Sequence, residues 1–217
     1  MGYGCLLFQK LPGFFLDVTA QSTLALICGQ YTGWGGGLID YDNDGYLDAF
    51  IANGNAHHLY SEEDVLARFD GKGKFVDVAR ESGDYFKEKY VGRGAAFGDY
   101  DNDGDLDILV CNLNDKPRLL RNDGGNKNHW LKVVPKDKET GMVAIGAQVR
   151  VKVAGLDMTQ PVVAVNGYLS SADPRAHFGL GAATEVESVE ITWPDGLKQR
   201  LEKVKADQVL EVVKGEK

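Results

Sequence analysis

Aspartates recur at the same positions of two nine-residue segments, 40–48 and 99–107. They occupy positions 1, 3, 5 and 9 of a DxDxDGxxD pattern, as Asp40, Asp42, Asp44 and Asp48 in the first segment and Asp99, Asp101, Asp103 and Asp107 in the second. Alternate residues of a tight loop can turn their carboxylates towards one centre, and Gly45 and Gly104 let the backbone bend. The carbonyl at position 7, from Tyr46 or Asp105, would also point inward. Because Ca²⁺ takes about six to eight such oxygens, the spacing predicts two calcium sites.

Other interpretations fit these two loops less well. Neither segment contains histidine or cysteine, which disfavours zinc and copper, and Mg²⁺ prefers a small rigid shell with fewer protein ligands. An EF-hand needs a glutamate at position 12, where these segments have Ile51 and Val110. A plain polar turn would leave its carboxylates unneutralised, and each pair about 4 Å apart costs about 1 kcal/mol even in water. A calcium loop between β-strands remains.

The two acidic segments belong to a longer internal repeat. Residues 33–54, GWGGGLIDYDNDGYLDAFIANG, align without a gap on residues 92–113, GRGAAFGDYDNDGDLDILVCNL, at an offset of 59. A second match, between FFLDVTA at 14–20 and KFVDVAR at 74–80, has an offset of 60. A partial match at 119–125 has no further FVDV after it. A period of about 60 residues indicates one supersecondary unit of a solenoid or propeller.

The residues around each loop indicate the strands that must position it. YLDAFIA at 46–52 and LDILVC at 106–111 are short apolar runs bounded by Asp, Asn and Gly, as is typical of buried strands. The glycine-rich entries GWGGG and GRGAA permit close approach of neighbouring strands. Only residues 61–68 and 80–89 suggest short helical turns. We therefore expect residues 1–127 to be all-β, a partial propeller with about two calcium-loop blades.

The pattern changes from residue 128 onwards. In AQVRVKV at 147–153 the valines alternate with polar residues, and VEITW at 189–193 alternates in the same way. Such alternation indicates strands with one buried face. HWLKVV at 129–134, PVVAV at 161–165 and VLEVV at 209–213 are further candidate strands, separated by turn signals. Residues 128–217 thus predict a small antiparallel β domain of sandwich or barrel type.

Composition narrows the possible partners. The chain has 217 residues, 43% of them hydrophobic, which is enough for a buried core. Its formal net charge of −8 disfavours nucleic acid as a partner. No apolar run approaches the roughly 18 to 20 residues of a membrane span. The start, MGYGCLLFQK, lacks the basic region and the apolar run of a signal peptide, so we expect none in this chain.

The motifs together resemble two known families. The pattern GxGxxxxDYDNDGxxD is similar to the FG-GAP, or VCBS, repeat of integrin-α-type β-propellers, with FGDYDNDGDLD at 97–107 as the best match. NHWLKV at 128–133, IGAQVRV at 145–151, GYLSSADPRAHFGLG at 167–181 and VEITWPDG at 189–196 resemble the ASPIC/UnbV domain. The resemblance implies an extracellular or cell-surface calcium-binding protein with an adhesion or matrix role, whose partner is an unknown protein or glycan.

The resemblance also raises the question of blade number. Integrin-type propellers close with about seven blades, and open edges invite pairing with other chains. Two full calcium repeats are present here, so we expect the missing blades to come from upstream sequence of a longer protein or from another chain.

One alternative function is an accessory domain of a calcium-dependent secreted enzyme, for example one that acts on polysaccharides. Ser170, Asp173 and His177 include the residue types of a catalytic triad, but spacing along the chain alone does not make a triad. In the ASPIC/UnbV domain this segment is a structural signature, and neither module has an established catalytic role. We therefore expect no catalytic residues and no enzyme activity.

Overall fold

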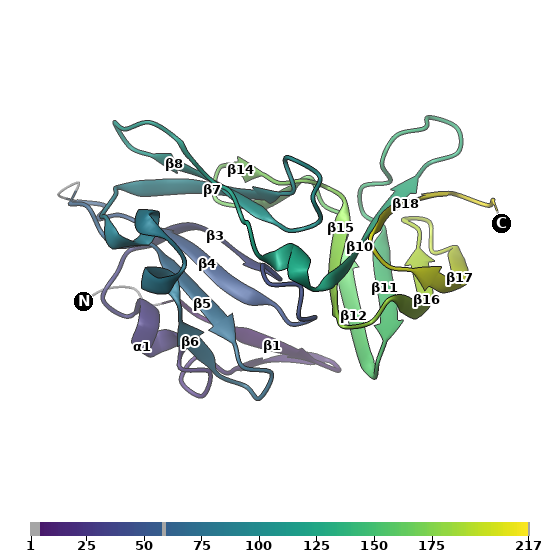
Figure 1. The fold of residues 1–217 in the computed structure, drawn as a ribbon, viewed down its shortest axis with the longest axis horizontal. Helices are drawn as coiled ribbons and strands as arrows, with labels where there is room; N and C mark the ends of the chain where they lie inside the picture. Colours follow the sequence, from purple (N-terminus) through teal and green to yellow (C-terminus); the bar gives the residue numbers. More distant parts are fainter. Residues whose placement is uncertain (1–4, 58–59, 217) are drawn as a thin grey trace.

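The computed structural model describes residues 5–57 and 60–216. The expectation about a signal peptide rests partly on residues 1–4, which lie outside the described residues. The described chain is almost entirely β-structure, as predicted, and its sheets fall into two groups (Figure 1). Its short helices are α1 (Leu24–Cys28) and the 3-10 helices η1 (Ala79–Glu81), η2 (Asp84–Lys87) and η3 (Gly125–Lys127).

The first group, called here the repeat sheets, contains three antiparallel sheets with the strand orders β1-β2, β3-β4-β5-β6 and β7-β8-β9. Their strands are β1 (Phe8–Leu11), β2 (Phe14–Asp17), β3 (Gly33–Ile39), β4 (Asp48–Asn53), β5 (Val65–Phe69), β6 (Phe75–Asp77), β7 (Gly92–Gly98), β8 (Asp107–Asn112) and β9 (Arg118–Leu120). Each acidic loop joins the first two strands of a sheet, β3 to β4 and β7 to β8. The sequence repeat is therefore also a repeat of strand pairing.

Strands β3 and β7 pack against each other along their glycine-rich segments. A Cβ atom on Gly35 would lie 2.4 Å from the Ala95 nitrogen, which no side chain tolerates. The strand pairing shifts register at the corresponding place in both hairpins, between Gly33 and Gly36 in β3-β4 and between Gly92 and Gly94 in β7-β8. The glycines thus serve the close backbone approach that the sequence predicted.

Strand β4 is buried on both faces. Phe50 and Ala52 contribute to a core shared with the next sheet, and Ala49 to a core on the side of β1 and α1. Phe50 meets Phe86 and Phe97 edge to face, with ring centroids 6.3 and 6.0 Å apart. The first acidic loop therefore ends in a strand that packing holds firmly, and such a strand can fix the loop in position.

The prediction of a helical turn at residues 61–68 is wrong, because β5 begins at Val65. Val65, Leu66 and Ala67 are all buried, as expected of a central strand covered on both faces. The helical turns predicted at 80–89 are confirmed by η1 and η2.

The second group, called here the carboxy-terminal sheets, contains sheets with the orders β15-β10-β18, β12-β11-β16-β17 and β13-β14. Their strands are β10 (His129–Lys136), β11 (Gln148–Val153), β12 (Leu156–Pro161), β13 (Val165–Gly167), β14 (Ser170–Ser171), β15 (Ala176–Gly181), β16 (Glu185–Thr192), β17 (Lys198–Lys205) and β18 (Gln208–Val213). The two larger sheets share one core, to which Leu131, Val151 and Ile191 each contribute a fully buried side chain. This is the predicted sandwich-like arrangement.

Two details of these sheets differ from the sequence prediction. Strands β10 and β18 pair in parallel, whereas the other pairs are antiparallel. PVVAV at 161–165 is not one strand, because β12 ends at Pro161 and the fully buried Val162 follows outside any strand. The longest helical element in the described part of the chain, α1, has five residues, and none has the length and hydrophobicity of a membrane span.

Candidate metal centre

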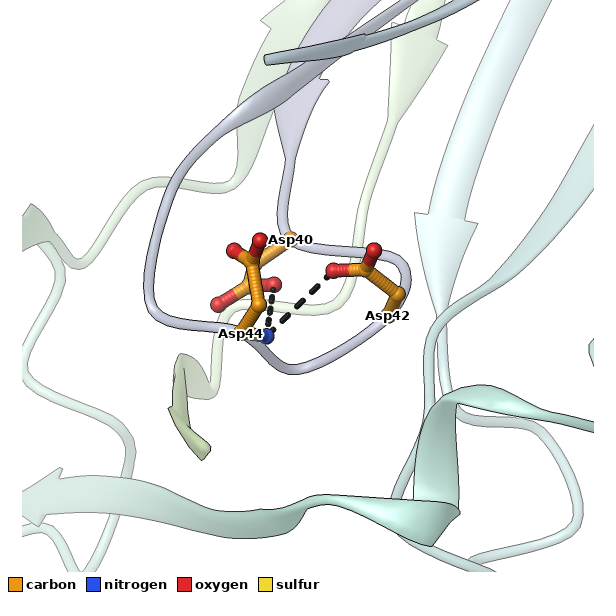
Figure 2. Close-up of side chains that lie close together, drawn as sticks. All are labelled: Asp40, Asp42 and Asp44. Atoms are coloured by element: carbon orange, nitrogen blue, oxygen red, sulfur yellow. Dashed lines mark hydrogen bonds between the residues drawn. The ribbon is translucent and has the colours of Figure 1, made fainter. Parts of the chain in front are cut away.

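The first acidic loop brings three of its predicted ligands together. One oxygen from each of the Asp40, Asp42 and Asp44 carboxylates lies within 4.8 Å of the other two (Figure 2). The Asp44 amide donates to Asp40 Oδ1 at 3.0 Å and to Asp42 Oδ1 at 3.3 Å, and the Gly45 amide donates to Asp40 Oδ2 at 2.9 Å. The backbone of the loop thus orients the carboxylates before any cation binds.

The remaining predicted ligands of this loop lie at its exit. Asp48 is fully buried at the start of β4, and its Oδ1 accepts a 2.8 Å hydrogen bond from the Phe69 amide. Its Oδ2 is buried and has no hydrogen-bond partner within residues 5–57 and 60–216. The Tyr46 amide donates to Asp44 Oδ1 at 2.9 Å, while an inward role for the Tyr46 carbonyl stays a prediction.

Burial and mutual repulsion make the charges of the first loop costly. Burial raises the pKa of Asp40 to about 8 and the pKa of Asp48 to about 7, and the neighbouring carboxylates add to both shifts. The pKa of Asp42 is raised for the same reasons. A cation beside these oxygens would favour their charged form by offsetting both the burial and the repulsion.

The second acidic loop repeats the backbone pattern of the first. The Asp103 and Gly104 amides donate to Asp99 at 3.1 and 3.0 Å, as Asp44 and Gly45 do to Asp40. Here the carboxylates that lie within 4.8 Å of one another belong to Asp99, Asp101 and Asp107. Asp103 is not part of this group, although its counterpart Asp44 belongs to the group in the first loop.

Asp105 and Asp107 are both buried in the second loop. Asp107 accepts hydrogen bonds from the amides of Tyr100 at 3.0 Å and Asn122 at 2.8 Å. Asp105 Oδ2 accepts from the Asn126 amide at 3.2 Å, whereas its Oδ1 is buried without a partner. Burial raises the pKa of Asp105 to about 7, and it raises the pKa of Asp107 as well.

The second loop differs from the first because it contacts two cationic side chains of the carboxy-terminal sheets. Lys132 of β10 forms an ion pair with Asp99, and both side chains are 1% exposed. Burial, with the nearby Arg175 charge, lowers the pKa of Lys132 to about 7. Arg175 donates to the Asp99 carbonyl at 3.1 Å and to Asn102 Oδ1 at 3.0 Å.

The first loop meets the same sheets through neutral groups. Asn43 Oδ1 is 2.6 Å from His177 Nε2, and the Asn43 carbonyl accepts from the Gly181 amide at 2.8 Å. Asn43 Nδ2 donates to the carbonyls of Gly104 at 3.1 Å and Gly125 at 3.2 Å, so it also connects the two loops. Both loops therefore lie where the repeat sheets contact the carboxy-terminal sheets.

Sequence reasoning missed these contact residues. Lys132, Arg175 and His177 follow the second loop by 25 residues or more, and no local spacing relates them to it. The asparagine at position 4 of each loop indicates only the local backbone: Asn43 and Asn102 have φ of 55° and 60°, a left-handed conformation that asparagine adopts readily.

The donor set of the first loop fits calcium. Each ligand candidate offers oxygen, and the Oδ2 of Asp48 gives the loop an acceptor that no group of the described residues satisfies. The second loop offers the same oxygen chemistry through Asp99, Asp101 and Asp107, but the Asp99 carboxylate already has a cationic partner in Lys132.

The three triad-type residues have separate partners. The Ser170 hydroxyl donates to the Tyr168 carbonyl at 2.9 Å, and Asp173 pairs with Arg175. His177 Nε2 contacts Asn43, as described above, and its Nδ1 is buried without a partner. In the described residues these side chains form no hydrogen-bonded series of nucleophile, base and orienting acid.

Comparison with known proteins gives matches in both parts of the chain. The FG-GAP-like repeat family matches residues 40–110, and the ASPIC and UnbV family matches residues 138–217. Cartilage acidic protein 1 of Mus musculus is 34% identical over 167 residues, which cover 72% of this chain and 25% of that protein. The Homo sapiens protein of the same name has the same identity and coverage of this chain, with 24% of its own length matched. The Xenopus tropicalis protein is 33% identical.

The chain thus spans about a quarter of the length of the curated relatives that it matches. The family matches include the acidic loops and most of the carboxy-terminal sheets, and FG-GAP repeats imply a propeller-type fold. The chain is an FG-GAP-like repeat protein with an ASPIC/UnbV domain, similar to cartilage acidic protein 1.

Proposed function

We propose that this chain is a non-catalytic calcium-binding module of β-propeller type, which serves extracellular protein or glycan interaction. The observation that carries the proposal is the pair of acidic loops in the same register, each with three carboxylates within 4.8 Å of one another. The unpartnered buried Oδ2 of Asp48, a predicted ligand of the first loop, supports it, because a nearby cation would satisfy this oxygen.

The aspartates of the two loops, with the position 7 carbonyls, would hold the ions. Calcium supplies charge that offsets the carboxylate repulsion. Because Asn43 contacts the second loop and also His177, a fixed first loop holds the repeat sheets against the carboxy-terminal sheets. Calcium would therefore stabilise the contact between the two groups of sheets, and a partner would meet a rigid surface.

Calorimetric titration with CaCl₂ and thermal melts in calcium or EGTA test the metal assignment. We expect calcium to raise the melting temperature, and Asp42→Asn together with Asp101→Asn to remove most of the difference. Asp84→Asn is the matched control, because the Asp84 side chain is 96% exposed and forms an ion pair with Lys87 across one turn of η2, outside both loops. Absence of calcium binding at millimolar concentration would refute the assignment.

The non-catalytic role and the partner class need a separate test. The FG-GAP and ASPIC/UnbV similarity supports an extracellular or cell-surface location and an adhesion-type role. We expect the calcium-loaded chain to bind a glycan or matrix protein in an array, and to show no turnover in a hydrolase and lyase screen. Turnover that is lost on changing one acid or base, with calcium binding intact, would favour the accessory enzyme domain instead.

A further inference from the structure

The hairpin β1-β2 is the structural counterpart of β5-β6. Phe8 pairs with Asp17 as Ala67 pairs with Asp77, and Gln9 pairs with Leu16 as Arg68 pairs with Val76. The hydrogen bonds beside the two hairpins match as well. The Val18 amide donates to the Leu7 carbonyl at 2.9 Å, as the Val78 amide does to the Leu66 carbonyl at 3.0 Å. The Thr19 amide donates to Asp17 Oδ1 at 2.9 Å, as the Ala79 amide does to Asp77 Oδ1 at 3.0 Å.

The two hairpins differ in what covers them. Strand β4 pairs with β5 through Ala49 with Ala67 and Ile51 with Val65, and Val65 and Ala67 are 2% and 0% exposed. The counterparts of Val65 and Ala67 in the first hairpin are Leu6 and Phe8, which are 67% and 52% exposed. Among the described residues, β2 is the only strand that pairs with β1, so the opposite edge of β1 is open.

The open edge presents backbone groups that are ready for pairing. The Leu7 carbonyl accepts a hydrogen bond from the Val18 amide, and the Leu7 amide donates to Thr19 Oγ1 at 2.7 Å. Both bonds lie on the β2 side of the strand. Successive residues of a strand direct their amides and carbonyls to opposite edges, so Leu6 and Phe8 direct theirs to the open edge. Unpaired backbone groups of this kind are a template for an added strand.

We propose that the open edge of β1 binds an antiparallel strand of the β4 type, the second strand of a further FG-GAP-type repeat. The internal repeat supplies the argument, since β4 covers the equivalent edge of β5 in this same chain. A second copy of this chain has no such strand to donate, because β4 and β8 are each paired on both edges within the described residues. The inference goes beyond the calcium assignment and does not depend on it.

A labelled peptide with the sequence of residues 46–54, YLDAFIANG, and a solubilising lysine tail tests this edge by fluorescence anisotropy with the whole chain. We expect saturable binding, weakened about tenfold or more by Phe8→Pro, which corresponds to about 1.4 kcal/mol. Proline removes the amide that faces the open edge. Phe15→Pro is the matched control, because it removes an amide from the outer edge of β2 and should leave binding unchanged.

Hydrogen exchange on the unaltered chain gives an independent readout if either proline variant folds poorly. We expect the peptide to slow exchange at the Leu6 and Phe8 amides, with no dependence on calcium. Equal binding by all three proteins, or protection at another edge, would overturn the proposal. It would also be overturned if the chain occupied this edge by self-association, detected by sedimentation, and bound no peptide.

Discussion

Replacing Lys132 with methionine tests the contact between the second loop and the carboxy-terminal sheets. Methionine fills a similar volume without the charge, so Asp99 would remain buried without its cationic partner. Both side chains are 1% exposed, and removing one member of a buried ion pair costs about 3–5 kcal/mol. Because Asp99 keeps its hydrogen bonds from Asp103 and Gly104, we expect the lower end of this range, about 3 kcal/mol.

The assay is denaturant unfolding in EGTA and again in calcium. Calcium should reverse part of the loss in Lys132→Met, since a cation at the second loop would neutralise Asp99. The matched control is Lys136→Met in the same strand, where Lys136 Nζ lies 2.7 Å from Glu211 Oε1 and the two side chains are 29% and 57% exposed. Partly exposed pairs of this kind contribute at most about 1 kcal/mol. If the two variants lost equal stability in EGTA, the buried pair would not have the role assigned to it.

Three further predictions follow. Gly104→Ala should destabilise the protein by more than the roughly 1–2 kcal/mol of a left-handed alanine, because its Cβ would lie 1.9 Å from Trp130 Nε1. Gly13→Ala is the control: Gly13 also has a positive φ but open space around it, so its replacement should cost only the backbone strain. If the two variants lost equal stability in urea unfolding, the predicted clash with Trp130 would be wrong. Burial raises the pKa of Asp64 to about 6, so its contribution to stability is present below pH about 4 and is lost as pH rises through about 6. Asp64→Asn should therefore show a shallower fall in unfolding free energy across that window, and identical pH profiles would rule the shift out. Phe50→Ala should cost about 3–5 kcal/mol in thermal or chemical unfolding, because Phe50 is 0% exposed between two sheets, and a loss under 1 kcal/mol would contradict the packing described.

The repeat and its loops could be predicted from sequence because their signals are local. The spacing of Asp40, Asp42 and Asp44 determines which carboxylates a tight turn can gather, and the structure gathers them. Alternation of period two likewise identified Val149, Val151 and Val153, which are at most 1% exposed. The carboxylate group of the second loop was predicted only in part, since Asp103 lies outside the group that contains Asp99 and Asp101.

What could not be predicted depends on long-range packing. SEEDVLAR reads as helix-forming, but pairing with β4 makes its second half the start of a strand, because burial on two faces outweighs local propensity. The cationic and polar groups that contact the loops, such as Lys132 and His177, come from strands of the carboxy-terminal sheets. No pattern within either loop identifies them.

The close approach at Gly35 also links the separation of the two repeat sheets to the size of a single residue. Adjacent sheets nearly touch where β3 meets β7, with room for no side chain. Phe97 of β7 packs beside the same contact, since a Cβ atom on Gly37 would collide with the Phe97 ring. Phe97 also meets Phe50 of β4 edge to face, with ring centroids 6.0 Å apart. A larger residue at position 35 would therefore push β3 and β7 apart and open the aromatic packing next to them.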